Sequence, residues 1–99
     1  AAYNTSKHAI VGLTRCVALE NAKNGINVNA ICPGIVETDL IKGVEQRMET
    51  QGMPPEEFRE RMLAHIPIGR LLQPEEIANI AVFLASSESD GMSGETISI

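Results

Sequence analysis

Tyr3 and Lys7 are the residues of this 99-residue sequence whose types and spacing could do chemistry together. On an α-helix, side chains four residues apart lie on one face, so the phenol and the ammonium can face one small volume. A cation held beside a phenol favours the phenolate, and such a pair can donate or accept a proton close to neutral pH. The alternative for the bare pair is an ordinary solvated helix face, and the elements that follow along the chain decide between the two.

A helix over residues 3–23 must position this pair. Its apolar residues recur at helical spacing, which predicts one buried side. Members of that stripe are Ile10, Leu13 and Val17. Asn24-Gly25 follows, and a glycine just past a helix end favours the left-handed cap. Residues 26–32 then alternate as a strand, and a helix joined to a strand by a short link is half of a βαβ unit, which implies a parallel sheet.

The second half of the chain predicts a helical insertion, a helix and a strand. Residues 39–68 are polar and contain Met residues, with helical stretches at 41–50 and 54–64. The last helix begins at Gln73-Pro74-Glu75-Glu76 and is apolar on more than one side, and residues 95–99 alternate as a strand. The predicted buried stripe of the last helix consists of Ile77, Ile80, Ala81 and Leu84.

Composition excludes several classes of partner. The chain is 43% hydrophobic and has a net charge of −5 without a Lys/Arg block, so neither nucleic acid nor an anionic membrane is an expected partner. No apolar run approaches the ~20 residues that span a bilayer. Cys16 and Cys32 have no partner at metal-ligand spacing, so we expect no metal site and interpret both thiols as reduced packing residues of a cytoplasmic protein. A disulfide between them is the less favoured alternative.

With the strand, the Pro33-Gly34 turn after it and the later elements in view, the chain resembles the C-terminal part of a short-chain dehydrogenase/reductase. In that family Tyr-x-x-x-Lys is the catalytic signature, here Tyr3 and Lys7, and Pro-Gly-x-x-x-Thr, here ending at Thr38, is a cofactor-binding loop. The resemblance covers nearly the whole chain. It implies an α/β fold, the C-terminal part of a Rossmann-like, doubly wound parallel sheet, and an NAD- or NADP-dependent oxidoreductase acting on a carbonyl or alcohol.

The resemblance also implies a role for each matched residue. Tyr3 would protonate the carbonyl oxygen in reduction or deprotonate the alcohol in oxidation, and Lys7 would favour the phenolate and bind the nicotinamide ribose. Pro33 and Gly34 would turn the loop at the cofactor. The backbone at Val36 would contact the nicotinamide carboxamide. Thr38 would help to hold the cofactor near its pyrophosphate, residues 39–68 would cover the substrate, and the full-length protein would be a homotetramer.

The family's other functional residues precede the Tyr and have no match here: a Ser that polarises the carbonyl, an Asn of the proton relay and the Gly-rich dinucleotide loop. We therefore expect residues 1–99 to be the C-terminal fragment of a single NAD(P)-binding Rossmann-like domain, cut at both ends and inactive by itself.

Several functions remain open. The Pro-Gly-Ile-Val segment and the insertion favour a small diol, polyol or hydroxy-ketone as substrate, with 3-oxoacyl reduction as the alternative within the same chemistry. A non-catalytic oligomerisation or scaffold module is the alternative from another class, although packing alone does not require Tyr3, Lys7 and Thr38 together. Epimerisation or dehydration ranks lower, because relatives with those activities usually carry a different C-terminal half.

Overall fold

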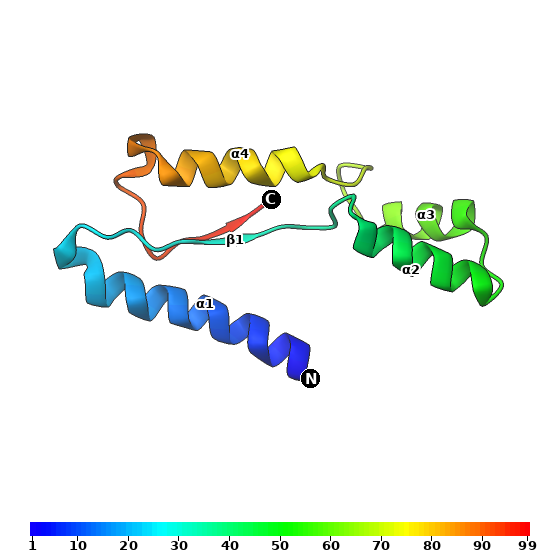
Figure 1. Cartoon of the computed structure of the whole chain (residues 1–99), viewed down its shortest axis with the longest axis horizontal. Helices are drawn as coiled ribbons and strands as arrows, with labels where there is room; N and C mark the ends of the chain where they lie inside the picture. The colour runs from blue at the N-terminus through cyan, green and yellow to red at the C-terminus, as the bar shows by residue number, and fades with distance from the viewer. The chain divides into compact units, whose positions relative to one another are not determined.

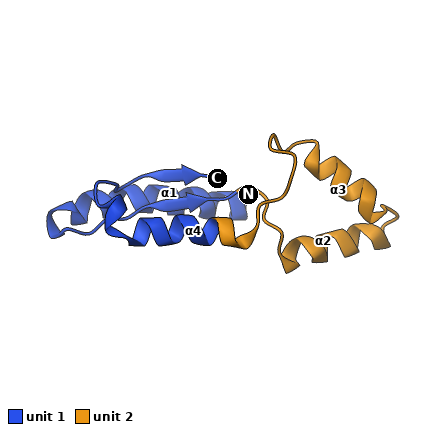
Figure 2. Cartoon of the chain, turned by 90° about the horizontal axis from the view of Figure 1, so that it is seen from above, with its two compact units in different colours: residues 1–33, 77–99 blue, residues 34–76 orange.

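The chain forms four α-helices and two short strands, and the computed structural model describes all residues, 1–99. The elements are α1 (Ala2–Asn21), β1 (Ala30–Cys32), α2 (Asp39–Thr50), α3 (Pro55–Leu63), α4 (Pro74–Ala85) and β2 (Thr96–Ser98) (Figure 1). This is the order of helix, strand, helical insertion, helix and strand that the sequence predicts. The chain divides into two compact units, residues 1–33 with 77–99 and residues 34–76 (Figure 2).

The first unit is built around a parallel pair of strands. Ala30 pairs with Thr96, Ile31 with Ile97 and Cys32 with Ser98. In the ribbon, α1 lies along one side of this pair and α4 along the other (Figure 1). A parallel pair covered by helices on both sides is an α/β layer arrangement, so the predicted fold class and strand direction are confirmed.

The first strand is shorter than the predicted 26–32, because asparagine side chains replace part of its backbone ladder. The Asn27 side-chain amide donates to the Asp90 carbonyl oxygen at 3.0 Å. The Asn29 side chain donates to the Met92 carbonyl at 3.0 Å and accepts from the Glu95 N–H at 3.1 Å. Residues 27–29 therefore follow the 90–95 segment mainly through side-chain hydrogen bonds, with one backbone bond from the Gly94 N–H to the Val28 carbonyl at 2.7 Å, and regular pairing begins at Ala30.

The buried side of α1 differs from the predicted stripe. Thr14 and Ala18 are its buried residues, whereas Ile10 and Leu13 are 51% and 63% exposed. A Cβ placed on Gly94 would lie 3.5 Å from the Ala18 Cβ, so the helix approaches the rest of its unit through a small side chain. The Thr14 hydroxyl donates to the Ile10 carbonyl oxygen at 2.8 Å, which allows a polar residue to be buried here.

The C-terminal end of α1 and the buried side of α4 can both be compared with the local sequence signals. After a 3-10 turn at Ala22–Asn24, Gly25 adopts the left-handed conformation (φ 71°) and its N–H donates to the Ala22 carbonyl, so the predicted glycine cap is confirmed. In α4, Ile77, Ile80 and Leu84 are half-buried, but Ala81 is exposed. Val82 and Phe83 are exposed as well, and none of the helices has the length and hydrophobicity that a membrane span requires.

The second unit joins the segment after β1 to the helices α2 and α3. Val36 and Leu72 form a parallel bridge, in which the Glu37 N–H donates to the Leu72 carbonyl at 2.8 Å and the Leu72 N–H donates to the Ile35 carbonyl at 2.9 Å. Leu71 and Leu72 are buried. These contacts fix the segment that the sequence assigns to cofactor binding.

The start of α4 is stabilised by a side-chain cap. The Glu76 carboxylate accepts from the Gln73 N–H at 2.7 Å and from both Arg70 guanidinium nitrogens at 2.8 Å. The hydrogen bonds from Arg70, and secondarily that from Gln73, lower the pKa of the Glu76 carboxyl to about 2. An acidic residue that binds a free N–H in the first helical turn also opposes the positive end of the helix dipole.

Candidate active site

Tyr3 and Lys7 lie on one face of α1, as their spacing predicts. The Lys7 ammonium nitrogen is 5.5 Å from the centre of the Tyr3 ring, a cation–π distance. Tyr3 is 72% exposed, so its hydroxyl is accessible from outside the unit. The helix begins at Ala2, with the Thr5 N–H and hydroxyl both bonded to the Ala1 carbonyl, which orders the turn that carries the tyrosine.

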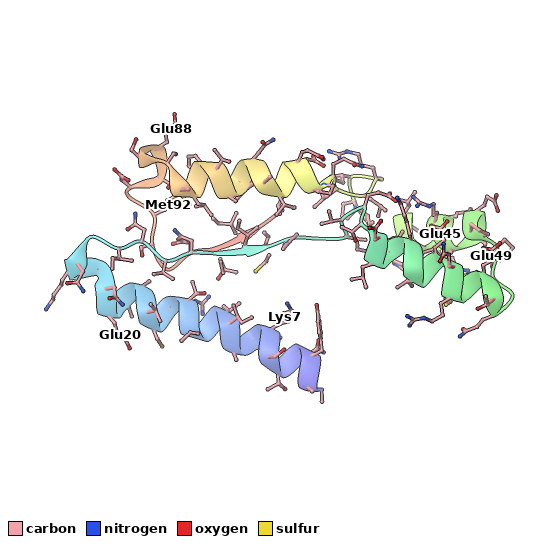
Figure 3. All side chains as sticks on the ribbon, in the orientation of Figure 1. Lys7, Glu20, Glu45, Glu49, Glu88 and Met92 are labelled. Carbon is pink, nitrogen blue, oxygen red and sulfur yellow. The ribbon has the colours of Figure 1, made fainter.

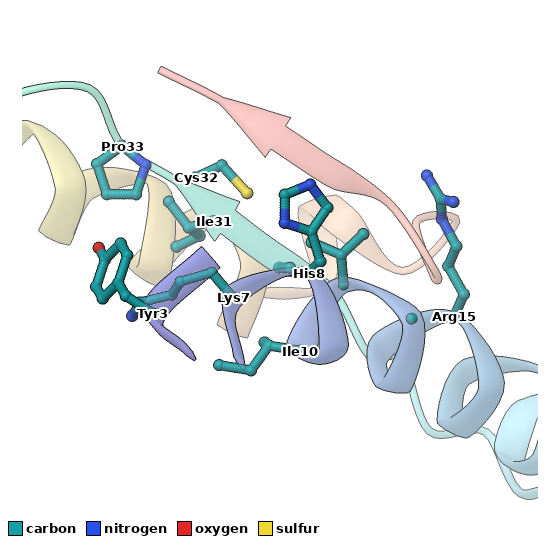
Figure 4. A pocket seen from close by; sticks show the side chains of 11 residues that line it. Tyr3, Lys7, His8, Ile10, Arg15, Ile31, Cys32 and Pro33 are labelled. Carbon is teal, nitrogen blue, oxygen red and sulfur yellow. The ribbon is translucent and has the colours of Figure 1, made fainter. Parts of the chain in front are cut away.

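An open cavity of about 730 Å³ adjoins the pair. Its walls come from α1 and from β1 with the residue that follows it, and Figure 4 shows Tyr3 and Pro33 at one end and Arg15 at the other. Pro33 follows the carboxyl end of β1, the position at which open parallel sheets bind ligands. Three of the predicted site residues, Tyr3, Lys7 and Pro33, therefore line one cavity.

The charge of this cavity is opposite to that of the whole chain. Lys7 and Arg15 contribute two cationic side chains to its lining, and no Asp or Glu belongs to the lining. The chain as a whole carries a net charge of −5. A cavity lined by one sign of charge raises the local concentration of ligands of the opposite sign, so this one suits an anionic ligand.

Val36 presents free backbone groups. In its parallel bridge the hydrogen bonds run through Ile35 and Glu37, so the N–H and C=O of Val36 itself point away from the Leu72 segment. No backbone hydrogen bond within the chain uses either group. An amide donor and an acceptor side by side match a carboxamide, which is the part of a nicotinamide that the resemblance assigns to this residue.

Thr38 caps α2 without using its side chain. It is the N-cap residue, with extended backbone (φ −139°, ψ 169°), and its hydroxyl makes no capping hydrogen bond. The hydroxyl and the first N–H groups of α2 are thus donors at a positive helix end, a combination that suits a phosphate group. Together with Val36, this set of donors fits the nicotinamide cofactor that the resemblance implies.

Sequence reasoning missed a charged cluster next to these residues. Arg59 of α3 donates to both oxygens of Glu37, at 2.9 and 3.1 Å, and its Nε donates to Glu45 of α2 at 2.9 Å. The hydrogen bonds from Arg59 lower the pKa of the Glu37 carboxyl, and those with Glu37 raise the pKa of Arg59. The sequence alone gives no reason to single out Glu37, because an acidic residue in a loop is usually solvated.

The predicted site residues thus belong to both units, and the division between them falls at the peptide bond from Pro33 to Gly34. Tyr3, Lys7 and Pro33 belong to the first unit, and the segment from Gly34 to Thr38 belongs to the second. Cys16 and Cys32 are free thiols, and no group of three or more His, Cys, Asp or Glu residues is arranged to hold a metal ion.

The parallel strand pair with a helix on each side defines a class of fold, the Rossmann-type α/β proteins. Comparison with known proteins gives the family. The sequence model of a family described as enoyl-(acyl carrier protein) reductase matches residues 1–99. The chain belongs to the short-chain dehydrogenase/reductase family, whose members generally use NAD(P), and the predicted resemblance is confirmed.

Three relatives illustrate the match. An acetoacetyl-CoA reductase of Shinella zoogloeoides is 42% identical over 99% of this chain and 37% of its own length. A short-chain dehydrogenase family protein of Francisella tularensis has a crystal structure that matches with a TM-score of 0.93 and 39% identity, over 99% of this chain and 41% of that one. A crystal structure of an actinorhodin polyketide ketoreductase variant with NADPH matches with a TM-score of 0.89 and 36% identity, over 98% of this chain and 38% of that one. The chain thus spans about two fifths of the length of the relatives that it matches.

Proposed function

We propose that the protein carrying this chain is an NAD- or NADP-dependent oxidoreductase that interconverts a carbonyl and an alcohol. The observation that carries the proposal is the pairing of Tyr3 with Lys7 in a cavity that reaches the carboxyl end of β1. Family membership supports the reaction class. The bound cofactor would supply or accept the hydride at the carbonyl carbon.

The chain's own residues would manage the proton and the geometry. In reduction, the Tyr3 hydroxyl donates its proton to the carbonyl oxygen as the hydride reaches the carbon, and the product is the alcohol. In oxidation, the Tyr3 oxygen accepts the alcohol proton. Lys7 would stabilise the negative charge on the Tyr3 oxygen and bind the ribose, while Val36 and Thr38 would hold the carboxamide and the pyrophosphate. Such positioning would bring the cofactor and the carbonyl carbon together before the chemical step.

A 3-oxoacyl compound and its 3-hydroxyacyl product are the proposed substrate class. The acetoacetyl-CoA reductase and the polyketide ketoreductase among the relatives support it. The cationic lining by Lys7 and Arg15 supports it as well, because an acyl thioester carrier brings phosphate groups. The small diol or polyol that the sequence favours has no comparable support and serves as the competing substrate in the test.

A homotetramer remains our proposal for the full-length protein. Its support is the apolar surface of the two helices: Leu13 and Leu19 of α1 are 63% and 81% exposed, and Val82 of α4 is 69% exposed. Exposed apolar patches on helices mark protein interaction sites. A native mass of four subunits is the expected result, and a monomeric mass at working concentration would contradict it.

The test of the proposed function uses the protein as its source produces it. NADH or NADPH oxidation is followed with acetoacetyl-CoA, and the reverse reaction with 3-hydroxybutyryl-CoA and with a small polyol. We expect turnover with the thioesters that exceeds turnover with the polyol. Absence of nicotinamide-dependent turnover with all of them would sink the proposal and favour the scaffold function, whereas turnover with the polyol alone would restore the substrate that the sequence favours.

A further inference from the structure

We propose that Arg59 is a positioning residue that couples the cofactor-binding segment Gly34–Thr38 to the helices α2 and α3. The proposal rests on the proposed function, in which this segment holds the cofactor and these helices cover the substrate. Its basis is one guanidinium group that binds the segment through Glu37 and α2 through Glu45.

The geometry uses three guanidinium nitrogens. Nη1 and Nη2 of Arg59 donate to the two oxygens of Glu37 at 3.1 and 2.9 Å, which is the parallel two-bond arrangement that a planar guanidinium makes with a carboxylate. Nε donates to Glu45 at 2.9 Å from a third direction. Figure 3 marks Glu45 on α2. Three separate pieces of the chain, the segment, α2 and α3, are therefore held by one side chain.

This network differs from the other ion pairs of the chain in its burial. The side chains of Arg59, Glu37 and Glu45 are 38%, 25% and 19% exposed. The pair of Arg61 with Glu57, also on α3, is 67% and 45% exposed. Partly desolvated, bidentate pairs are stronger than exposed ones, which are worth little. The two arginines of α3 therefore provide a matched comparison, one in the network and one in a surface pair.

Glu37 is the link between the network and the cofactor. It stands between Val36 and Thr38, the residues assigned to the carboxamide and the pyrophosphate. Its backbone N–H is fixed by the Leu72 carbonyl at 2.8 Å, and its side chain is fixed by Arg59. Because both the backbone N–H and the side chain of Glu37 are held, a shift of α3 would turn the peptide groups on either side of this residue. In this proposal a cofactor held by Val36 and Thr38 would restrain α2 and α3 through Glu37 and Arg59, and by linkage a substrate held by these helices would strengthen cofactor binding.

The test compares Arg59→Met, Arg59→Lys and Glu45→Gln with Arg61→Met in the full-length protein. Fluorescence titration with NADH and NADPH measures cofactor affinity, and hydrogen exchange of residues 34–63 is measured with and without cofactor. We expect Arg59→Met to weaken cofactor binding about tenfold or more and to abolish the cofactor-dependent protection of α2 and α3. Arg59→Lys should have a smaller effect in the same direction, since lysine keeps the charge but cannot form the two parallel bonds. Glu45→Gln should also have a smaller effect, since it leaves both bonds to Glu37 in place. Arg61→Met should leave both measurements unchanged.

Each outcome separates this inference from the proposed function. Turnover by the wild-type protein, with equal affinity and equal exchange in Arg59→Met and Arg61→Met, would overturn the coupling and leave the proposed function standing. A lower kcat in Arg59→Met with unchanged cofactor affinity and unchanged exchange would overturn it as well. If the wild-type protein does not turn over, the proposed function fails, and faster exchange of residues 34–38 in Arg59→Met, but not in Arg61→Met, still supports the positioning role.

Discussion

Replacing Tyr3 by Phe removes one oxygen atom from a side chain that is 72% exposed. A surface substitution of this kind changes the free energy of unfolding by no more than about 0.5 kcal/mol. Proton transfer by a positioned side chain contributes about 10²–10⁴-fold to a rate, which corresponds to about 2.7–5.4 kcal/mol of barrier. The expected result for Tyr3→Phe is therefore a loss of kcat/KM by that factor with an unchanged melting temperature.

Lys7→Met extends the same reasoning, because it removes the charge and keeps the apolar stem. The ammonium lies 5.5 Å from the Tyr3 ring centre, and an exposed cation–π contact is worth about 0.5–1 kcal/mol, so the cost in stability is small. In the proposed mechanism both residues act on one proton. The double variant should therefore lose about as much activity as the more damaging single variant, instead of the product of the two losses.

The assay is steady-state kcat/KM with thermal unfolding of each variant, and Lys23→Met serves as the matched control. Lys23 lies in the 3-10 turn after α1 and outside the cavity lining, so its loss should leave turnover unchanged. Wild-type turnover in Tyr3→Phe would refute the assignment of the proton donor. Losses that multiply in the double variant would refute the idea that the two side chains act as one unit.

Two further predictions concern stability. Gly25→Ala should destabilise the protein by about 1–2 kcal/mol in urea unfolding, because φ is 71° and nothing lies within 4 Å of a Cβ there to compensate. Gly43→Ala, in open space inside α2, should stabilise it by about 0.8–1.0 kcal/mol, and equal signs for the two changes would contradict the argument. The pKa of Glu76 is lowered to about 2 by Arg70, so its contribution to stability is complete above about pH 4.5 and is lost as the pH falls toward 2. Glu76→Gln should remove that part of the acid dependence, measured as melting temperature between about pH 5 and pH 2, and an unchanged profile would show that the cap does not contribute.

The parts of the structure that depend on near neighbours in sequence are the parts that the sequence predicts. The helical period places Lys7 over Tyr3, and a glycine after a helix places Gly25 in the left-handed region. The order of elements follows from the same local signals. The parallel direction of β1 and β2, which lie far apart in the sequence, follows from that order, because the helices between them form a crossover connection. The family resemblance adds the roles of Val36 and Thr38, which remain proposals.

The features that the sequence does not predict depend on partners far along the chain. Arg59 meets Glu37 and Glu45 across 22 and 14 residues, and no periodic pattern connects them. The one sequence signal for this network is the presence of an arginine, Arg59, among many acidic residues. The sequence predicts large apolar residues on the buried side of α1. In the structure Ala18 is buried there instead, because its small side chain permits a close approach to Gly94.

The bridge between Val36 and Leu72 gives the insertion a common base. Its two stems meet through hydrogen bonds of 2.8 and 2.9 Å, so everything between them is a closed excursion from one point of the backbone. Doubling the length of a flexible loop costs only about 0.6 kcal/mol of closure free energy. The length of residues 39–70 can therefore change at little cost in closure free energy, provided that the contact of Arg59 with Glu37 is kept. In protein engineering terms the insertion is a cassette between two fixed stems, and under the proposed function it is the place at which substrate specificity would be redesigned.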